Sequence, residues 1–263
     1  MTSSPWFLRG TAGARQAARV YCFPHAGGNP RAFLGWQQDL GEDAEVVAVC
    51  PPGRGPRYRE TALTTVPELA DGAAAAIAAT ADRPFVLFGH SFGAVLAFEV
   101  ARRIGGLPDF RHLIASGCSA PELLPSRRIV ETARLEGREF TEAVGFFGGL
   151  PPEVVADEAL QELLLPHLRS DFRMVAEYAY LPAPPLDVPV TLINGSDDPH
   201  VTEAGLAPWG RECAGGLAQH WADGGHFYFD GNPGAVTDLL RSLVRGTGAP
   251  GANAPVDEHV ELI

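Results

Sequence analysis

The chain of 263 residues contains no lysine, so all of its 20 basic side chains are arginines. They are outnumbered by 32 acidic residues, which gives a net charge of -12. This excess argues against nucleic acid and against an anionic membrane surface as partners. No apolar run approaches the roughly 20 residues that span a bilayer, and the N-terminus lacks the basic-then-apolar pattern of a secretory signal. We therefore expect a cytoplasmic protein.

Closely spaced cysteines are also missing. The four that occur are far apart, with no C-x-x-C pair and no metal-ligand spacing: Cys22, Cys50, Cys118 and Cys213. This pattern predicts no metal site. The first three lie in or beside apolar runs, so we expect them to be reduced core residues.

Apolar runs alternate with helical patterns along most of the chain. The expected strands are Ala18–Phe23, Glu45–Cys50, Phe85–Phe88, His112–Ala115, Val188–Ile193 and Ala218–Trp221. The expected helices are Phe33–Leu40, Pro67–Thr80, a stretch that ends at Ile104, and Val236–Arg245. Buried strands that alternate with helices predict an α/β fold, with a mostly parallel central sheet and helices on both of its faces.

One segment interrupts the alternation. Residues 121–182 have helical character throughout and add no strand, with runs such as Arg127–Phe140, Glu158–Leu165 and Ser170–Tyr178. We interpret the segment as an inserted helical lid; the alternative is a set of ordinary crossover helices. The core would then comprise residues 18–120 and 183–245. We expect a flexible arm at 1–17 and a disordered tail at 246–263, where Gly, Ala and Pro are frequent.

A nucleophile motif follows the third expected strand. Gly89-His90-Ser91-Phe92-Gly93 matches G-x-S-x-G between a buried strand and a helix. On so sharp a turn, side chains two residues before and after the serine would collide, which explains both glycines. The turn also places Ser91 at the positive end of the next helix. The pattern predicts a serine nucleophile on an α/β-hydrolase fold.

A serine hydroxyl needs a base, and in this fold the partners follow in the order Ser, acid, His. Asp197 and Asp198 both follow the strand that ends near Ile193. His226 lies in a Gly-Gly loop after the last expected strand. Of its rivals, His200 is too close in sequence to the acid, and His220 lies within a strand. His25 and His90 are interpreted as packing or hydrogen-bonding neighbours.

An oxyanion hole requires two backbone N–H groups. We expect one from Phe92, the residue after the nucleophile, and one from Ala26 in the loop after the first strand. The alternative for the Gly27-Gly28 pair is an ordinary flexible turn.

Five motifs occur in one order: Phe23-Pro24-His25-Ala26-Gly27-Gly28, Pro52-Gly53-Arg54-Gly55, Gly89-His90-Ser91-Phe92-Gly93-Ala94, Gly195-Ser196-Asp197-Asp198-Pro199 and Gly225-His226-Phe227. Together they resemble the discrete type II thioesterases that accompany polyketide synthases and nonribosomal peptide synthetases. The resemblance covers residues 18 to 244 and extends to Asp171-Phe172-Arg173. Phe92 departs from it, since methionine is common there. The resemblance favours Asp198 over Asp197 as the acid.

The resemblance implies an editing enzyme. Such an enzyme removes aberrant or stalled acyl groups from the phosphopantetheine arm of acyl or peptidyl carrier proteins. It needs no cofactor of its own, because the pantetheine arrives with the substrate. We expect a monomer. Since carriers are usually acidic too, docking would need a local basic patch, for which four residues are candidates: Arg127, Arg128, Arg134 and Arg138. Such a row is equally a solvated helix face.

Phe146, Phe147 and Leu150 are candidates for the acyl pocket, with core packing as the alternative. Three other functions share the same motifs or fold: a carboxylesterase or lipase acting on free esters, an acyltransferase, and a noncatalytic relative that binds a ligand. The last usually lacks a triad member, and none is missing here.

Overall fold

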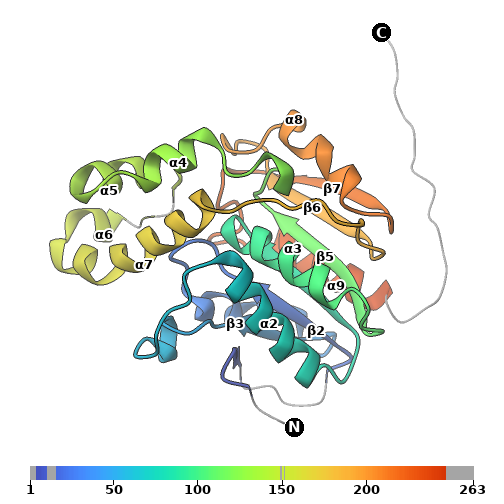
Figure 1. Cartoon of the computed structure of the whole chain (residues 1–263). Coiled ribbons are helices and arrows are strands. Elements are labelled where there is room, and N and C mark those ends of the chain that lie inside the picture. Colours follow the sequence, from blue (N-terminus) through green and yellow to red (C-terminus); the bar gives the residue numbers. More distant parts are fainter. Residues whose placement is uncertain (1–3, 11–15, 149, 151, 247–263) are drawn as a thin grey trace.

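The computed structural model describes residues 4–10, 16–148, 150 and 152–246 (Figure 1). Within them, seven strands form one sheet in the order β1-β3-β2-β4-β5-β6-β7. Every neighbouring pair is parallel except β1 with β3. The mostly parallel α/β sheet expected from the sequence is therefore confirmed.

The strands are short and regular. They span Phe7–Arg9 (β1), Ala18–Phe23 (β2), Ala44–Val49 (β3), Phe85–His90 (β4), Phe110–Ser116 (β5), Val190–Gly195 (β6) and Leu217–Ala222 (β7). The helices span Gln37–Leu40 (α1), Val66–Thr80 (α2), Phe92–Ile104 (α3), Arg127–Ala133 (α4), Gly137–Gly145 (α5), Pro152–Ala156 (α6), Glu158–Ala176 (α7), Glu203–Leu206 (α8) and Gly234–Gly246 (α9). Four 3-10 segments complete the described secondary structure: Pro30–Trp36, Gly55–Arg57, Pro121–Leu123 and Ala207–Arg211.

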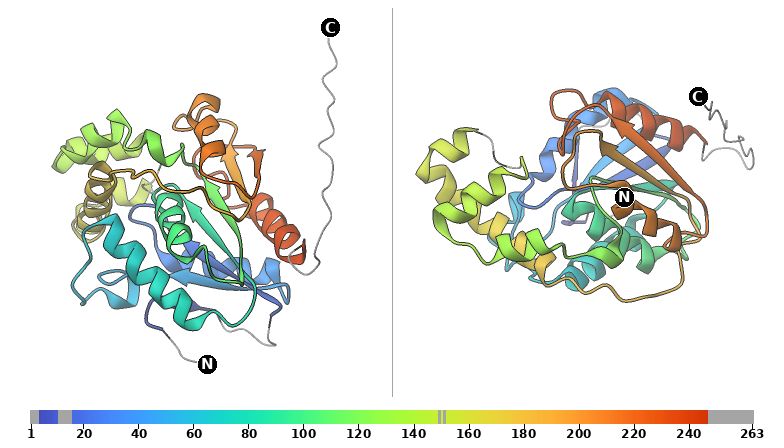
Figure 2. Two further views of the ribbon diagram at one scale, coloured as in Figure 1. Left: turned by 45° about the vertical axis from the view of Figure 1, so that its right-hand side comes forward. Right: turned by 90° about the horizontal axis from the view of Figure 1, so that it is seen from above.

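Helices cover both faces of the sheet, as the view from above in Figure 2 shows. Tyr21 and Leu87 point into a core shared with α2 and α3. Their chain neighbours Cys22 and Phe88 point into the opposite core, beside the 30–36 segment, α1 and α9. Because central strands are buried on both sides, they are apolar without alternation, which is why the sequence showed them as unbroken runs.

The segment between β5 and β6 contains α4 to α7 and no strand in its described part. These helices, green to gold in Figure 1, lie together beyond one end of the sheet. The expected helix Arg127–Phe140 is divided in two, because Gly137 has a φ of +50°, a left-handed conformation that a continuous helix excludes. The two expected helices after it are joined into α7, which contains Pro166.

The expectation of a flexible arm over residues 1–17 is wrong for β1. Phe7 to Arg9 pair with Val49 to Val47 at the edge of the sheet. Phe7 is buried and its ring lies 5.1 Å from that of Tyr21, so the strand gains both hydrogen bonds and apolar burial. Residues 1–3, 11–15 and the expected tail from 247 onward lie outside the described residues; Gly246 closes α9.

Candidate active site

Ser91 occupies the sharp turn between β4 and α3. Its φ of +54° makes it the one non-glycine residue with positive φ in the part of the chain that the structure describes. A Cβ added to Gly89 would lie 2.1 Å from the carbonyl oxygen of Gly93, and one added to Gly93 would lie 2.1 Å from that of Phe23. Both positions therefore require glycine, for the steric reason that the motif suggested. The strained turn holds Ser91 above the carboxyl end of the sheet.

Asp198 and His226 form a buried pair at the same end of the sheet. The Nδ1 atom of His226 lies 2.7 Å from Oδ2 of Asp198. The other carboxylate oxygen accepts a 2.8 Å hydrogen bond from the backbone N–H of His200. Asp197, in contrast, is exposed, and its backbone N–H donates to Gly224. The structure thus brings Asp198, and not Asp197, against His226.

The environment of Asp198 favours its ionised form. Burial alone would raise the pKa of this carboxyl group. The hydrogen bonds and charges of His226 and the His200 backbone outweigh that effect and hold the pKa below its usual range. An ionised Asp198 fixes a proton on Nδ1 of His226 and leaves Nε2 free to act as a base.

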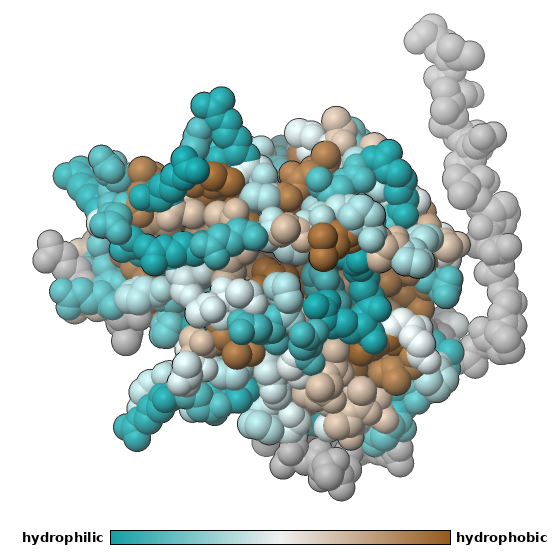
Figure 3. Space-filling model, viewed as in Figure 1, coloured by the Kyte–Doolittle hydropathy of each residue, from teal (hydrophilic) through white to brown (hydrophobic). Residues whose placement is uncertain are grey.

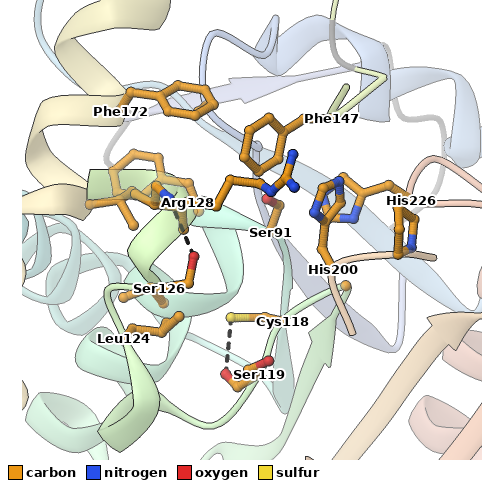
Figure 4. A pocket seen from close by; sticks show the side chains of 17 residues that line it. Ser91, Cys118, Ser119, Leu124, Ser126, Arg128, Phe147, Phe172, His200 and His226 are labelled. Carbon is orange, nitrogen blue, oxygen red and sulfur yellow. Dashed lines mark hydrogen bonds between the residues drawn. The ribbon is translucent and has the colours of Figure 1, made fainter. Parts of the chain in front are cut away.

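Ser91 and His226 share the wall of a cavity of about 280 Å³. In Figure 4, Ser91 lies below Arg128, with the rings of His200 and His226 to one side. Among the described residues, no hydrogen bond joins the Ser91 hydroxyl to His226. Catalytic hydrogen bonds are often long without substrate, so this is compatible with a working pair. Much of the remaining wall is apolar, and it includes Val95, Leu124, Ile129, Phe147, Phe172 and Val175.

The two backbone groups expected to form an oxyanion hole both border this cavity. Phe92 is the first residue of α3, so its N–H has no acceptor within the helix. Ala26, in the loop after β2, also lines the cavity. The structure therefore brings together Ser91, His226, Ala26 and Phe92 from three separate parts of the chain.

The other histidines near the site have distinct surroundings. Burial, with a contribution from His226, lowers the pKa of His25 to about 4 and that of His90 well below its usual value. His90 also bonds to Ser116, which in turn bonds to Tyr228. Both imidazoles are thus neutral neighbours, as expected. His200 reaches Asp198 through its backbone and not its ring, and His220 is exposed on β7.

Two of the three residues expected to line the acyl pocket do not do so. Phe147 borders the cavity and stacks on His200 at 4.4 Å. Phe146, however, is 49% exposed. The guanidinium carbon of Arg128 lies 3.8 Å from the centre of the Phe146 ring. Leu150 packs against the apolar cluster between the inserted helices. Phe146 and Phe147 directly follow the short helix α5. Sequence alone could not orient that helix, so it could not tell which of the two rings would border the cavity.

Two of the four arginines of the expected basic patch are paired with glutamates of their own helices. Arg127 pairs with Glu131, and Arg138 pairs with Glu142, each one helical turn away. Arg128 instead lines the cavity. Figure 3 shows hydrophilic side chains, in teal, over α4 and α5, the two helices that carry these ion pairs. Such exposed pairs are ordinary features of a solvated helix face.

Sequence reasoning did not assign roles to Asp171 and Arg54, and it did not place Cys118 at the cavity. Asp171 is buried on α7 and bonds to Arg54 and to the backbone of Gly27. The signal that the sequence offered for Asp171 was a carboxylate on the apolar side of a helix. Cys118 borders the cavity. All four cysteines are unpaired, and Cys22, Cys50 and Cys118 are buried, as expected.

In the described ranges, no group of three or more His, Cys, Asp or Glu residues could hold a metal ion. No helix there is long and apolar enough to cross a membrane.

Comparison with known proteins identifies the family. Residues 18–243 match the model of the thioesterase domain family. The chain is 33% identical to thioesterase PikA5 of Streptomyces venezuelae, over 95% of this chain and 89% of that protein.

Two solved structures have the same fold. The type II thioesterase BorB from the borrelidin biosynthetic cluster is 31% identical, with a TM-score of 0.83 over 93% of this chain and all of that one. YbtT, a type II thioesterase from the yersiniabactin NRPS/PKS biosynthetic pathway, is 28% identical, with a TM-score of 0.81 and the same coverage. The chain therefore belongs to the thioesterase domain family and is a thioester hydrolase.

Proposed function

We propose that this enzyme is an editing thioesterase, which removes aberrant or stalled acyl groups from the phosphopantetheine arm of carrier proteins during polyketide or nonribosomal peptide synthesis. The observation that carries the proposal is the buried His226–Asp198 pair beside Ser91 in a largely apolar cavity. The names of the relatives support the pathway: PikA5 is a thioesterase, and YbtT is a type II thioesterase of an NRPS/PKS system.

In the proposed mechanism, the hydroxyl oxygen of Ser91 attacks the thioester carbonyl carbon while Nε2 of His226 accepts its proton. Asp198 stabilises the imidazolium that forms. The N–H groups of Ala26 and Phe92 donate to the oxyanion of the tetrahedral intermediate. The C–S bond then breaks, and the pantetheine sulfur leaves as a thiol with the proton from His226.

The acyl group is now an ester of Ser91. A water molecule gives a proton to His226 and attacks the carbonyl carbon. The second tetrahedral intermediate collapses to a free carboxylic acid as the bond to the Ser91 oxygen breaks, and His226 returns its proton to that oxygen. These steps use only the side chains and backbone groups of the site, and the pantetheine arm enters as part of the substrate.

The cavity limits the size of the acyl group that can enter. Ligand sites for drug-sized molecules usually measure roughly 300–1,000 Å³, so a cavity of about 280 Å³ is small. Ile129, Phe147, Phe172 and Val175 of the 121–182 insertion form much of its wall. We therefore assign the insertion the role of a lid that limits acyl size and excludes water during acyl transfer.

The carrier partner must approach an acidic protein. Because Arg127 and Arg138 are paired with glutamates, we propose that docking depends on contacts around the cavity mouth and not on attraction between whole molecules. We also propose that the enzyme is a monomer in the cytoplasm, as expected from the sequence. Analytical sedimentation at micromolar concentration tests the monomeric state.

Intact mass spectrometry of acyl-carrier proteins tests the proposal. Carriers loaded with acetyl, propionyl, butyryl and octanoyl groups are mixed with the enzyme, and the loss of acyl mass is followed over time. We expect rapid loss of the short acyl groups with the wild type and none above background with Ser91→Ala. Equal turnover of carrier-bound thioesters and free carboxylic esters would contradict a carrier-directed role and favour a general esterase.

A further inference from the structure

Asp171 connects the helical insertion to the oxyanion loop. It lies on α7 and is only 5% exposed. Its Oδ2 atom accepts a 2.7 Å hydrogen bond from the backbone N–H of Gly27, the residue that follows Ala26. Burial raises the pKa of this carboxyl group, while Arg54 and the Gly27 N–H oppose that rise. With the carboxylate ionised, the bond to Gly27 is charge-assisted, one of the stronger kinds of hydrogen bond in proteins.

The second oxygen of Asp171 ties in another loop. Oδ1 lies 2.5 Å from Nη2 of Arg54, which is itself largely buried in the segment after β3. The same guanidinium contacts Nδ1 of His167, one turn earlier on α7, at 3.1 Å. The Asp171 carboxylate thus joins two loops of the core, and Arg54 supplies its counter-charge.

Apolar contacts hold the same junction. A Cβ added to Gly27 would lie 2.8 Å from Cδ1 of Leu168, so α7 presses directly on the loop backbone. Ala26 packs against the apolar cluster that contains Leu168 and Phe172. Gly27 has a φ of +69°, which a side chain would oppose. The loop is therefore held both by its own turn, in which the Gly28 N–H donates to the His25 carbonyl, and by its contacts with α7.

The next residues of α7 form the cavity wall. Phe172 and Val175 border the cavity that contains Ser91, and Figure 4 shows the Phe172 ring at its upper side. One turn of one helix therefore both shapes the acyl pocket and holds the loop that carries the Ala26 N–H group.

We propose that Asp171 is a positioning residue that fixes the Ala26 N–H group of the oxyanion hole through Gly27 and Arg54, so that the hole is complete only while α7 lies against the core. The inference rests on the oxyanion role proposed for Ala26. It makes the insertion part of the catalytic apparatus as well as a cover for the pocket.

A change at Asp171 should act on the transition state more than on substrate binding. Misplacement of a catalytic group by about 1 Å can cost roughly 100-fold in rate, and loss of one oxyanion donor costs about 10²- to 10³-fold in kcat. We expect Asp171→Asn to lower kcat by about 10- to 100-fold on acetyl-carrier protein and to leave KM within about twofold, because the asparagine keeps the acceptor but loses the charge that pairs with Arg54.

The matched control is Glu162→Gln, which removes a carboxylate from an exposed position of the same helix. Arg54→Gln and Arg54→Lys form a second pair, in which lysine retains the charge and should recover part of the activity that glutamine loses. Melting temperatures of all variants separate a local effect from unfolding.

A carrier-independent readout keeps this proposal apart from the proposed function. Alkylboronic acids form a tetrahedral anionic adduct with a serine hydroxyl, so their affinity reports the oxyanion hole directly. We expect Asp171→Asn to weaken boronate inhibition of free-thioester hydrolysis by about the factor lost in kcat. Unchanged boronate affinity, a loss equal to that of Glu162→Gln, or a rise in KM alone would overturn the role of Asp171. Inactivity of the wild type on carriers would overturn only the carrier assignment.

Discussion

The imidazole of His226 lies 2.7 Å from one carboxylate oxygen of Asp198, while the other oxygen accepts the backbone N–H of His200. Both carboxylate oxygens of this buried acid therefore have a hydrogen-bond partner, and only one of them is available to the imidazole. This relationship holds the His226 imidazole through its Nδ1 atom and distinguishes Asp198 from its exposed neighbour Asp197.

The first prediction compares the two adjacent aspartates. Asp198→Asn should lower kcat by about 10⁴-fold, the cost of the corresponding change in a serine protease, because the amide no longer stabilises the correct imidazole tautomer or the imidazolium. Asp197→Asn is the matched control and should change kcat less than about twofold, since Asp197 is exposed. Steady-state kinetics on acetyl-carrier protein measure both. A comparable loss of kcat in Asp197→Asn would contradict the assignment of Asp198 as the acid.

The second prediction concerns the strained backbone of Ser91. Ser91→Ala and Ser91→Gly both remove the hydroxyl and should both be inactive. Glycine accepts a φ of +54° without strain, whereas alanine does not. Strain of this kind costs roughly 1–3 kcal/mol. Part of the stability gained by relieving it is lost in the glycine variant, because glycine increases the conformational entropy of the unfolded chain. Urea unfolding should therefore show Ser91→Gly to be more stable than Ser91→Ala by about 1 kcal/mol; equal stability would mean that the turn is unstrained.

The third prediction separates the two adjacent phenylalanines. Phe147→Ala should enlarge the cavity and raise the ratio of kcat/KM for octanoyl- over acetyl-carrier protein by about 10-fold, since each buried CH₂ contributes about 0.8 kcal/mol. Phe146→Ala removes an equal ring outside the cavity wall and should leave that ratio unchanged. Competition between the two acyl-carriers, followed by mass spectrometry, gives the ratio. A larger change in the ratio for Phe146→Ala than for Phe147→Ala would indicate that Phe146, and not Phe147, contacts the acyl chain.

The fourth prediction concerns acid stability and His112. Burial lowers the pKa of this imidazole from 6.5 to about 4, and its Nε2 atom lies 2.7 Å from the Thr191 hydroxyl oxygen. Between these two values the unfolded chain binds a proton that the folded chain does not, so the free energy of unfolding falls as pH decreases from 6.5 to 4. The contribution is up to about 3 kcal/mol at 1.36 kcal/mol for each pKa unit.

His112→Asn removes that proton site and should make the decline between pH 6.5 and 4 shallower. His220→Asn, at an exposed position of β7, should leave the decline as in the wild type. Urea unfolding at half-unit pH steps measures each curve. A wild-type slope in His112→Asn would show that other groups govern acid unfolding.

Much of the core was predictable because its residues obey local rules. The runs around Val20, Val46 and Leu87 are apolar since both sheet faces are covered, and the glycines at 89 and 93 report a turn that admits no Cβ. The choice of Asp198 over Asp197 needed the resemblance to a family, because the residues alone left both open.

The remainder depended on packing between distant segments. β1 forms because a free edge of β3 lies beside Phe7, which no local pattern reveals. Phe147 borders the cavity while its neighbour Phe146 packs against Arg128, a difference that depends on how the inserted helices lie against the core. The bond from Asp171 to Gly27 joins residues 144 positions apart, so periodicity within either segment gave no indication of it.

The contact between Asp171 and Gly27 sets a rule for protein engineering. The proposed nucleophile, base and acid all lie outside residues 121–182, so an insertion from a relative with another acyl preference could be transplanted without moving them. The oxyanion loop, however, is held from within the insertion. A chimera should therefore retain the aspartate, its Leu168 neighbour and the matching Arg54 as one module, and grafts that omit this module should fold yet hydrolyse slowly.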